Sequence, residues 1–158
     1  MIALTSPGGI RTDIIRKDDG TVSYGELFAS QPFRNRLVTL TLTGRQLKDM
    51  LEQQWLDAKR PRILQVSDGF SYAWDATKPF GERVLPDRML LDGKPIDPSA
   101  PYRITINDYL AGGGDGFVVA KEGTSQQYGG YDADALFAFF KANGPIAPNA
   151  PSRILRLY

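Results

Sequence analysis

The chain contains neither histidine nor cysteine among its 158 residues. Histidine is the commonest general base in enzymes and the commonest side-chain ligand of transition metals. Its absence excludes a Ser-His-Asp hydrolase, a histidine-ligated zinc enzyme and a histidine-ligated two-metal phosphatase for this chain. Without cysteine, the fold relies on no disulfide and no thiolate ligand, which suits an oxidising or a reducing compartment equally.

The sequence also lacks a strong charge of either sign and a long apolar run. It has 19 basic and 18 acidic residues, whereas a surface that follows a nucleic-acid backbone shows a clear basic excess. We therefore expect no nucleic-acid polymer as a partner. No apolar run approaches the roughly 18 residues that a membrane span requires, so none is expected. The length and the 42% hydrophobic content suit one domain, over 1–158, with its own core.

Apolar residues recur with the periods of strands and helices in an irregular order. Alternation and apolar runs predict strands over 3–5, 37–42, 63–66, 70–74, 102–107 and 153–157, with an edge strand within 84–91. The strands over 63–66 and 70–74 are expected to form a hairpin that turns at Ser67-Asp68-Gly69. Hairpins mixed with helices predict an α+β fold with mixed or antiparallel sheets rather than a doubly wound parallel sheet.

Helical spacing predicts helices over about 24–29, 44–58 and 132–143, with Ser23, Thr43 and Asp132 as caps. Thr43 and Gln46 have the spacing of a capping box. Two helices present apolar faces that we expect to be buried, made of Leu47, Met50, Leu51 and Trp55 in one and of Ala135, Leu136, Phe139 and Phe140 in the other. A linker is expected over 146–151. Glu26, Glu52 and Asp57 are interpreted as charges on helix surfaces.

The stretch from Asn107 to Phe117 follows a predicted strand and contains four glycines. Such a run lets the backbone adopt positive φ angles and approach a ligand closely. Tyr109 and Asp115 are the groups that a sugar attached to a flat base requires, because a ring can stack on the base and a carboxylate can accept bonds from hydroxyls. A tight connection without a ligand is the alternative.

Arg11 follows a Gly8-Gly9 turn near the start of the chain. There its guanidinium can act as a two-pronged donor to a phosphate or a carboxylate. A solvated arginine is the alternative. Because the sequence begins on a short strand that runs straight into this turn, we expect it to be a fragment of a longer protein.

Several motifs occur in a characteristic order, namely Ser6 to Arg11, Gln31 to Asn35, Leu42 to Gly44, Tyr72 to Asp75 and Asn107 to Phe117. Together they resemble the C-terminal domain of the 5′-nucleotidase family, which includes periplasmic 5′-nucleotidases, UDP-sugar hydrolases and 2′,3′-cyclic phosphodiesterases. The resemblance covers nearly the whole chain.

The resemblance implies a two-domain parent that hydrolyses nucleotide phosphate esters in the periplasm or outside the cell. Its N-terminal metallophosphatase domain carries two divalent metal ions (Zn, Mn, Mg or Ca) and the catalytic residues. This chain is then the C-terminal substrate-binding domain, with no catalytic residue, metal or cofactor of its own. We expect it to bind a nucleotide or nucleoside, to place the phosphate at the metal site, and to be inactive when isolated.

Site residues follow from the resemblance position by position. Phe33 and Tyr109 correspond to the two rings that clamp the base, and Asp115 corresponds to the carboxylate that receives the ribose hydroxyls. Arg11 corresponds to the arginine that reaches toward the phosphate end, where Gly8 and Gly9 keep the backbone close.

Three positions depart from the family pattern. Ser6 stands where the family usually has an asparagine that helps hold the base. Arg34 replaces a common glycine and either narrows the site or adds a cation for a second phosphate. Tyr109 replaces a phenylalanine and keeps the stacking face.

Two other hypotheses remain open at this stage. In the first, the chain is a non-catalytic binding or structural module that has lost nucleotide recognition, with Phe33 and Tyr109 buried in its core. In the second, it is an independent enzyme, which is the weaker hypothesis because no base-nucleophile pair or metal cluster can be assembled from its residues.

Overall fold

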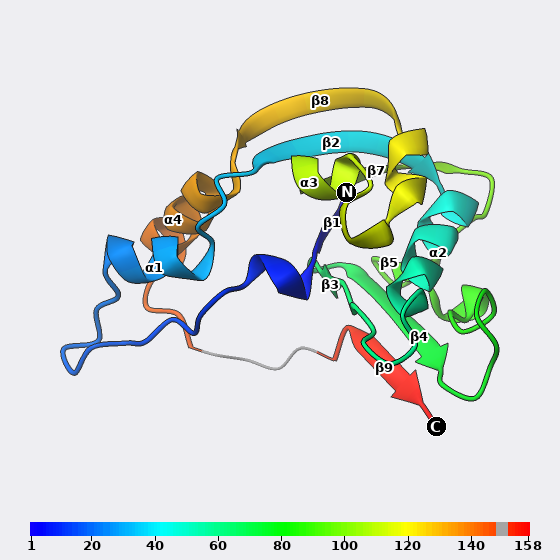
Figure 1. Ribbon diagram of the computed structural model, residues 1–158, viewed down its shortest axis with the longest axis horizontal. Coiled ribbons are helices and arrows are strands. Elements are labelled where there is room, and N and C mark those ends of the chain that lie inside the picture. Colours follow the sequence, from blue (N-terminus) through cyan, green and yellow to red (C-terminus); the bar gives the residue numbers. More distant parts are fainter. Residues whose placement is uncertain (148–151) are drawn as a thin grey trace.

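The computed structural model describes residues 1–147 and 152–158, and it has the α+β fold predicted from the sequence (Figure 1). The strands are β1 Ile2–Thr5, β2 Arg36–Thr43, β3 Gln65–Val66, β4 Phe70–Asp75, β5 Leu90–Leu91, β6 Lys94–Pro95, β7 Pro101–Asn107, β8 Thr124–Tyr131 and β9 Ile154–Leu157. The α-helices are α1 Tyr24–Ser30, α2 Gly44–Glu52, α3 Asp108–Ala111 and α4 Asp132–Asn143. Most of the linker predicted over 146–151 lies outside the described residues.

A five-stranded mixed sheet with the order β3-β1-β7-β2-β8 forms the larger layer. β1 runs parallel to β7, whereas β2 is antiparallel to β7. The alternation that predicted β2 buries Val38, Leu40 and Leu42 completely, and the register sets Leu40 opposite Ile104. Two alternating strands thus place their apolar sides on the same face of the sheet, where the core lies.

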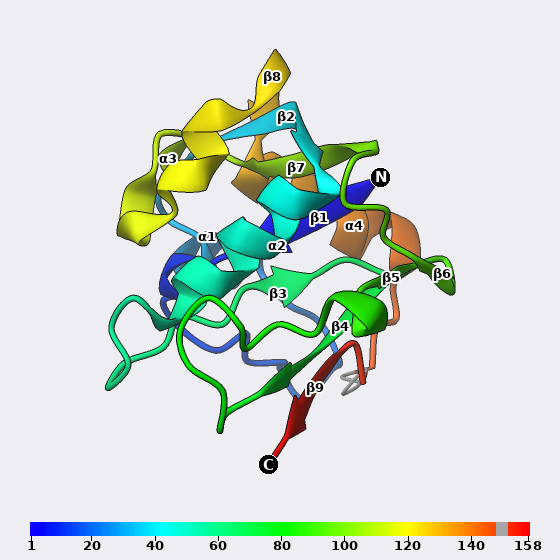
Figure 2. The same cartoon turned by 90° about the vertical axis from the view of Figure 1, so that its right-hand side faces the viewer.

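A smaller sheet with the order β6-β5-β4-β9 lies beside the first (Figure 2). The predicted hairpin over 63–66 and 70–74 is wrong, because β3 pairs with β1 of the larger sheet while β4 pairs with β5 and β9. Ser67 is held to β1, since its backbone N–H donates to the Ala3 carbonyl and its Oγ accepts the Ala3 N–H, both at 2.9 Å. The chain therefore passes from one sheet to the other at the predicted turn.

Helix α2 begins as predicted, with the reciprocal Thr43 and Gln46 capping bonds both formed. It ends at Glu52 and continues as a 3₁₀ turn to Trp55, so it is shorter than predicted. Gln54 accounts for this change, because its buried amide donates to the Leu51 carbonyl at 2.7 Å and accepts the Leu64 N–H at 2.6 Å. The apolar stripe predicted on this helix is buried.

Glu52 contradicts its interpretation as a surface charge, since it is 3% exposed. Its carboxylate accepts the Val84 N–H at 2.7 Å and the Gly81 N–H at 3.1 Å, and Lys48 Nζ lies 3.3 Å away. A buried carboxylate with three donors is satisfied, and this one ties α2 to the loop that precedes β5. The spacing of charges along the helix gave no sign of partners so distant in sequence.

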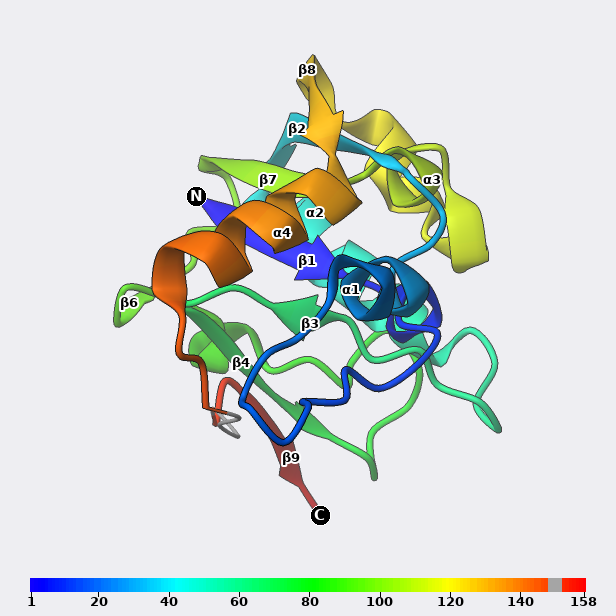
Figure 3. The ribbon, with the colours of Figure 1, turned by 90° about the vertical axis from the view of Figure 1, so that its left-hand side faces the viewer.

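Helix α4 also departs from its predicted burial. Tyr131, not Asp132, occupies the cap position, and Ala133 is its one buried residue. Phe139 is 53% exposed although it was predicted to face the core. The helix packs against α1, where the Tyr24 and Phe137 rings lie 4.2 Å apart (Figure 3). Because its phenylalanines point to several sides, its spacing did not identify one buried face.

Strand β8 was not predicted, and every one of its residues is exposed. Its sequence, Thr124 to Tyr131, lacks the apolar alternation by which half-buried strands are recognised. It forms the outer edge of the larger sheet through antiparallel pairing with β2, with two register shifts. Within the described residues no helix has the length and apolar character needed to cross a membrane.

Candidate functional site

The glycine-rich stretch after β7 folds into the short helix α3 and two 3₁₀ turns, where a loop was predicted. Asn107 caps α3, because its Oδ1 accepts the Leu110 N–H at 2.9 Å. Gly113 and Gly116 have φ angles of +84° and +89°, and Asp115 between them has +56°. Glycine adopts such angles without strain, whereas Asp115 holds a conformation that costs about 1 kcal/mol or more.

Tyr109 projects from α3 with 52% of its surface exposed. One side of its ring covers Gly114, where an added Cβ would lie 2.5 Å from Cε1. Its hydroxyl donates to Asp115 Oδ1 and accepts the Asp115 N–H, both at 3.2 Å. The glycine and the aspartate thus fix the ring and leave much of it in contact with solvent.

Asp115 is the centre of a set of polar contacts from three segments. Ser6 donates from Oγ to Asp115 Oδ2 at 3.0 Å, and Ser6 in turn accepts the Gly8 N–H at 3.2 Å. Arg62 lies 3.6 Å from Asp115 Oδ1 through its Nε. Sequence reasoning did not identify Arg62, because it stands in an Arg-Pro-Arg stretch that marked only the end of a helix.

The turn that was predicted near Arg11 is a 3₁₀ turn over Pro7–Gly9, capped by Ser6. A Cβ on Gly8 would lie 3.5 Å from Asp115 Oδ2, which is ordinary contact distance. The turn therefore brings the Gly8 backbone close to the Asp115 carboxylate, whereas Gly9 lies farther from it. The Arg11 N–H donates to the Ser30 carbonyl at 2.9 Å, which joins this turn to the end of α1.

Phe33 lies on the loop between α1 and β2 and is 53% exposed. The Arg11 guanidinium carbon stands 5.5 Å from the centre of its ring. Phe33 and Tyr109 are therefore both half-exposed, which differs from the hypothesis that buries them in the core. Among the described residues, neither of these two rings contacts another aromatic ring, so the two do not stack on each other.

Arg34 has a φ angle of +52°, and its guanidinium carbon lies 5.0 Å from the centre of the Tyr131 ring on β8. The structure thus brings Ser6, Gly8, Tyr109 and Asp115 into one bonded cluster and Arg11 with Phe33 into a second. Arg34 is directed to a third place, the edge strand of the sheet.

A cavity of about 330 Å³ lies between the larger sheet and α4. Leu4, Leu37, Ile106 and Leu136 contribute to its lining, and none of the predicted site residues does. Asp132 stands at its border, where burial raises the pKa of the carboxyl above its ordinary value of 3.8. The Asn35 amide donates to this carboxylate at 3.2 Å.

Metal ligation was assigned by resemblance to a separate N-terminal domain. In residues 1–147 and 152–158, no group of three or more acidic side chains is placed to hold a metal ion. The described part of this chain therefore offers no fit for the two-metal centre.

Comparison with known proteins shows which family shares this fold and these motifs. The family described as "5'-nucleotidase, C-terminal domain" matches residues 1–122. An apyrase from Tabanus yao is 30% identical over 165 residues, covering 97% of this chain and 29% of that protein. The cell wall protein Lmo0130 of Listeria monocytogenes is 33% identical over 124 residues, covering 76% of this chain and 16% of that protein.

A solved structure agrees with these relatives. The crystal structure of a 5'-nucleotidase precursor from Thermus thermophilus superposes with a TM-score of 0.84 and 33% identity. The match covers 99% of this chain and 31% of that one, so the chain spans less than a third of the length of each of these three relatives. The chain belongs to the family of 5'-nucleotidase C-terminal domains.

Proposed function

We propose that this chain binds the nucleoside part of a nucleotide and positions its phosphate for hydrolysis by a second domain. The bonded cluster of Ser6, Tyr109 and Asp115, together with the half-exposed Phe33, is the observation that carries the proposal. Two exposed rings supply flat faces for a base, which stacks on aromatic side chains irrespective of its identity. Asp115 supplies a fixed acceptor for ribose hydroxyls.

Arg11 supplies the positive charge of the proposed site. Its backbone is fixed to Ser30, and its guanidinium lies over Phe33, next to the proposed base. From there it can meet the phosphate end of a nucleotide with paired donors. Arg62 neutralises part of the charge of Asp115 in the free protein, and we infer that it yields to ligand hydroxyls when the site fills.

The hydrolytic chemistry belongs, in this proposal, to an N-terminal metallophosphatase domain with two divalent metal ions. The relatives are more than three times as long as this chain, which leaves room for such a domain. We further propose a periplasmic or cell-surface location for the parent, in line with the cell wall protein of Listeria monocytogenes. The isolated chain is expected to release no phosphate from AMP, with or without added Mn²⁺ or Zn²⁺.

Calorimetric titration of the chain with adenosine, AMP, UDP-glucose and inorganic phosphate tests the proposal. Each stacked ring contributes about 1–3 kcal/mol, so Phe33→Ala or Tyr109→Ala is expected to weaken adenosine binding about 5- to 150-fold. Phe80→Ala is the matched control, since Phe80 has the same 53% exposure on another loop. Binding that survives the Phe33→Ala/Tyr109→Ala double change, or that phosphate alone reproduces, would refute a base-binding site.

A further inference from the structure

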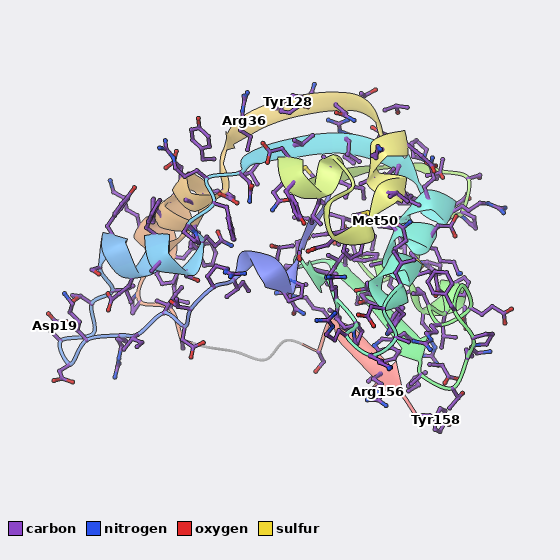
Figure 4. All side chains as sticks on the ribbon, viewed as in Figure 1. Asp19, Arg36, Met50, Tyr128, Arg156 and Tyr158 are labelled. Carbon is purple, nitrogen blue, oxygen red and sulfur yellow. The ribbon has the colours of Figure 1, made fainter. Side chains whose placement is uncertain are left out.

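Three arginine side chains lie over aromatic rings of the loop before β2 and of β8. Arg11 lies over Phe33, as described above. The guanidinium carbon of Arg34 lies 5.0 Å from the centre of the Tyr131 ring, and that of Arg36 lies 5.3 Å from the centre of the Tyr128 ring. We define the last four residues, Arg34, Arg36, Tyr128 and Tyr131, as the arginine-tyrosine strip. All four are exposed, and Figure 4 shows Arg36 and Tyr128 together where β2 and β8 approach α1 and α4.

The backbone of the strip adjoins that of Phe33, a ring of the proposed nucleoside site. Arg34 follows Phe33 directly, and Arg36 pairs with Tyr131 in the register of β2 and β8. The Asp132 N–H donates to the Asn35 carbonyl at 2.9 Å, which fastens the loop carrying Phe33 to the end of β8. A chain advances at most about 3.6 Å per residue, so the backbone of Arg36 lies within roughly 11 Å of that of Phe33.

In residues 1–147 and 152–158, neither cation of the strip has a carboxylate partner. Among the described residues, Arg11, Arg34 and Arg36 form no salt bridge, whereas Arg60, Arg62 and Arg153 do. Arg36 is held in place by two bonds from Nε and Nη2 to the Gly129 carbonyl, at 3.3 and 3.2 Å. Uncompensated guanidinium groups that already rest on rings present a flat, positive surface.

That surface has the chemical groups needed to bind a second nucleotide unit. Bases stack on tyrosine rings and on the planes of arginine guanidinium groups, and the same groups bind phosphate oxygens in pairs. Arg34 directly follows Phe33, the proposed base-binding ring, so this arrangement suits a ligand with two bases. A single nucleotide held at Phe33 would leave the strip unused.

We propose that the arginine-tyrosine strip is a second base-and-phosphate site, for ligands in which two nucleosides are joined through phosphate. The inference rests on the proposed function, because the first base is taken to lie at Phe33. Arg34 and Tyr131 hold the second base, and Arg36 over Tyr128 extends the positive surface beyond it. The linkage can be a phosphodiester or a pyrophosphate, which share this chemistry.

Calorimetry on the whole chain tests the proposal with three ligands: AMP, adenylyl-(3′→5′)-adenosine and diadenosine 5′,5′-pyrophosphate. We expect at least one two-nucleoside ligand to bind about 5- to 150-fold more tightly than AMP, since one more base is stacked. The ratio of the affinity for the two-nucleoside ligand to the affinity for AMP should fall to about one in Tyr131→Ala and persist in Tyr131→Phe. Whichever linkage gives the larger ratio identifies the preferred source.

Arg156→Ala is the matched control, because Arg156 lies over Trp74 at 5.4 Å in the smaller sheet, and it should leave the ratio unchanged. Thermal unfolding of each variant verifies folding. A ratio near one in the wild-type chain, or a ratio that survives Tyr131→Ala, overturns the second site. If Phe33→Ala leaves AMP binding unchanged while the affinity ratio still depends on Tyr131, the second site is supported and the proposed function is refuted. If the chain binds none of the three ligands, both the second site and the proposed function are refuted.

Discussion

Asp115 and Tyr109 satisfy each other's polar groups in the free protein. The Asp115 side chain is 20% exposed, and it also meets Ser6 and Arg62, so its oxygens are directed before a ligand arrives. Groups held in advance lose little freedom on binding, which raises the affinity obtained from each contact. The left-handed backbone of Asp115 is consistent with this arrangement, since strained residues persist where their surroundings determine them.

Gly114→Ala tests whether the position of the Tyr109 ring against Gly114 is needed for adenosine binding. The added Cβ would lie 2.5 Å from Cε1 of the ring, so the ring must move away. Because Tyr109 is half-exposed it can do so at a modest cost in stability, about 1–3 kcal/mol. Adenosine affinity is expected to fall at least about fivefold through lost stacking, as measured by calorimetry.

Gly112→Ala is the control for this substitution, because a Cβ there would lie 3.4 Å from the Asp108 carbonyl oxygen and clear of the ring. Equal losses of affinity in the two variants would contradict a specific role for Gly114.

Glu52 provides a second test at the residue scale. Glu52→Gln replaces one carboxylate oxygen with an amide that faces backbone N–H groups, so a buried donor loses its acceptor. Bonds to charged groups contribute about 1.5–3 kcal/mol, and we expect urea unfolding to show a loss of about that size. Glu82→Gln, on an exposed glutamate of the same loop, should change stability by roughly 0.5 kcal/mol or less. A Glu52 variant as stable as this control would refute the anchoring role.

Single residues differ in how far local sequence reveals them. Tyr109 and Asp115 could be selected because they lie on one glycine-rich stretch. Ser6 joins Asp115 across 109 positions, and Arg62 comes from a segment with no local pattern of its own. Such contacts depend on the order of strands in the sheet, which periodicity does not specify.

At the scale of elements, β2, β7, α1 and α2 were predictable because each has a clean period and α1 and α2 begin with capping residues. The pairing of β3 was not, because two residues give no period and a Ser-Asp-Gly turn suits a hairpin or a crossing between sheets. β8 escaped prediction because both its faces are exposed, and α4 was placed in the core because phenylalanine was equated with burial.

The capping box of α1 predicts a pH effect. Glu26 accepts the Ser23 hydroxyl and N–H at 2.7 and 2.6 Å, and these bonds lower the pKa of its carboxyl below the ordinary 4.5. A lowered folded-state pKa means that the contribution to stability is present above pH 4.5 and is lost as the pH falls through the folded-state value.

Thermal unfolding between pH 5.5 and 3 checks this expectation. Glu26→Gln should show a smaller fall in Tm over that interval than the wild-type chain, because it no longer has the carboxylate to protonate. Glu82→Gln should retain the wild-type slope, since among the described residues the Glu82 side chain makes no hydrogen bond. A slope in Glu26→Gln equal to that of the wild type would contradict the assignment.

At the scale of the whole molecule, one apolar cluster joins both sheets. Leu40 and Ile104 from the larger sheet share it with Phe70 and Tyr72 from the smaller, and Trp55 closes one side against Trp74 at 4.8 Å. A core without a boundary between the sheets predicts that they unfold together. Neither tryptophan is in the larger sheet, since Trp55 is on α2's extension and Trp74 is on β4, so their fluorescence reports on the region around the smaller sheet.

Leu40→Ala tests that prediction, because Leu40 is fully buried in β2. Removing it should cost about 2–5 kcal/mol and shift the urea midpoints of tryptophan fluorescence and far-ultraviolet circular dichroism by the same amount. Leu155→Ala, at a side chain 52% exposed on β9, should shift both by little, roughly 0.5 kcal/mol. A circular dichroism midpoint that falls while the fluorescence midpoint stays would show two independently unfolding layers. The proposed site would then belong to the larger sheet alone, because β1, β2, β7 and their loops supply its residues except Arg62.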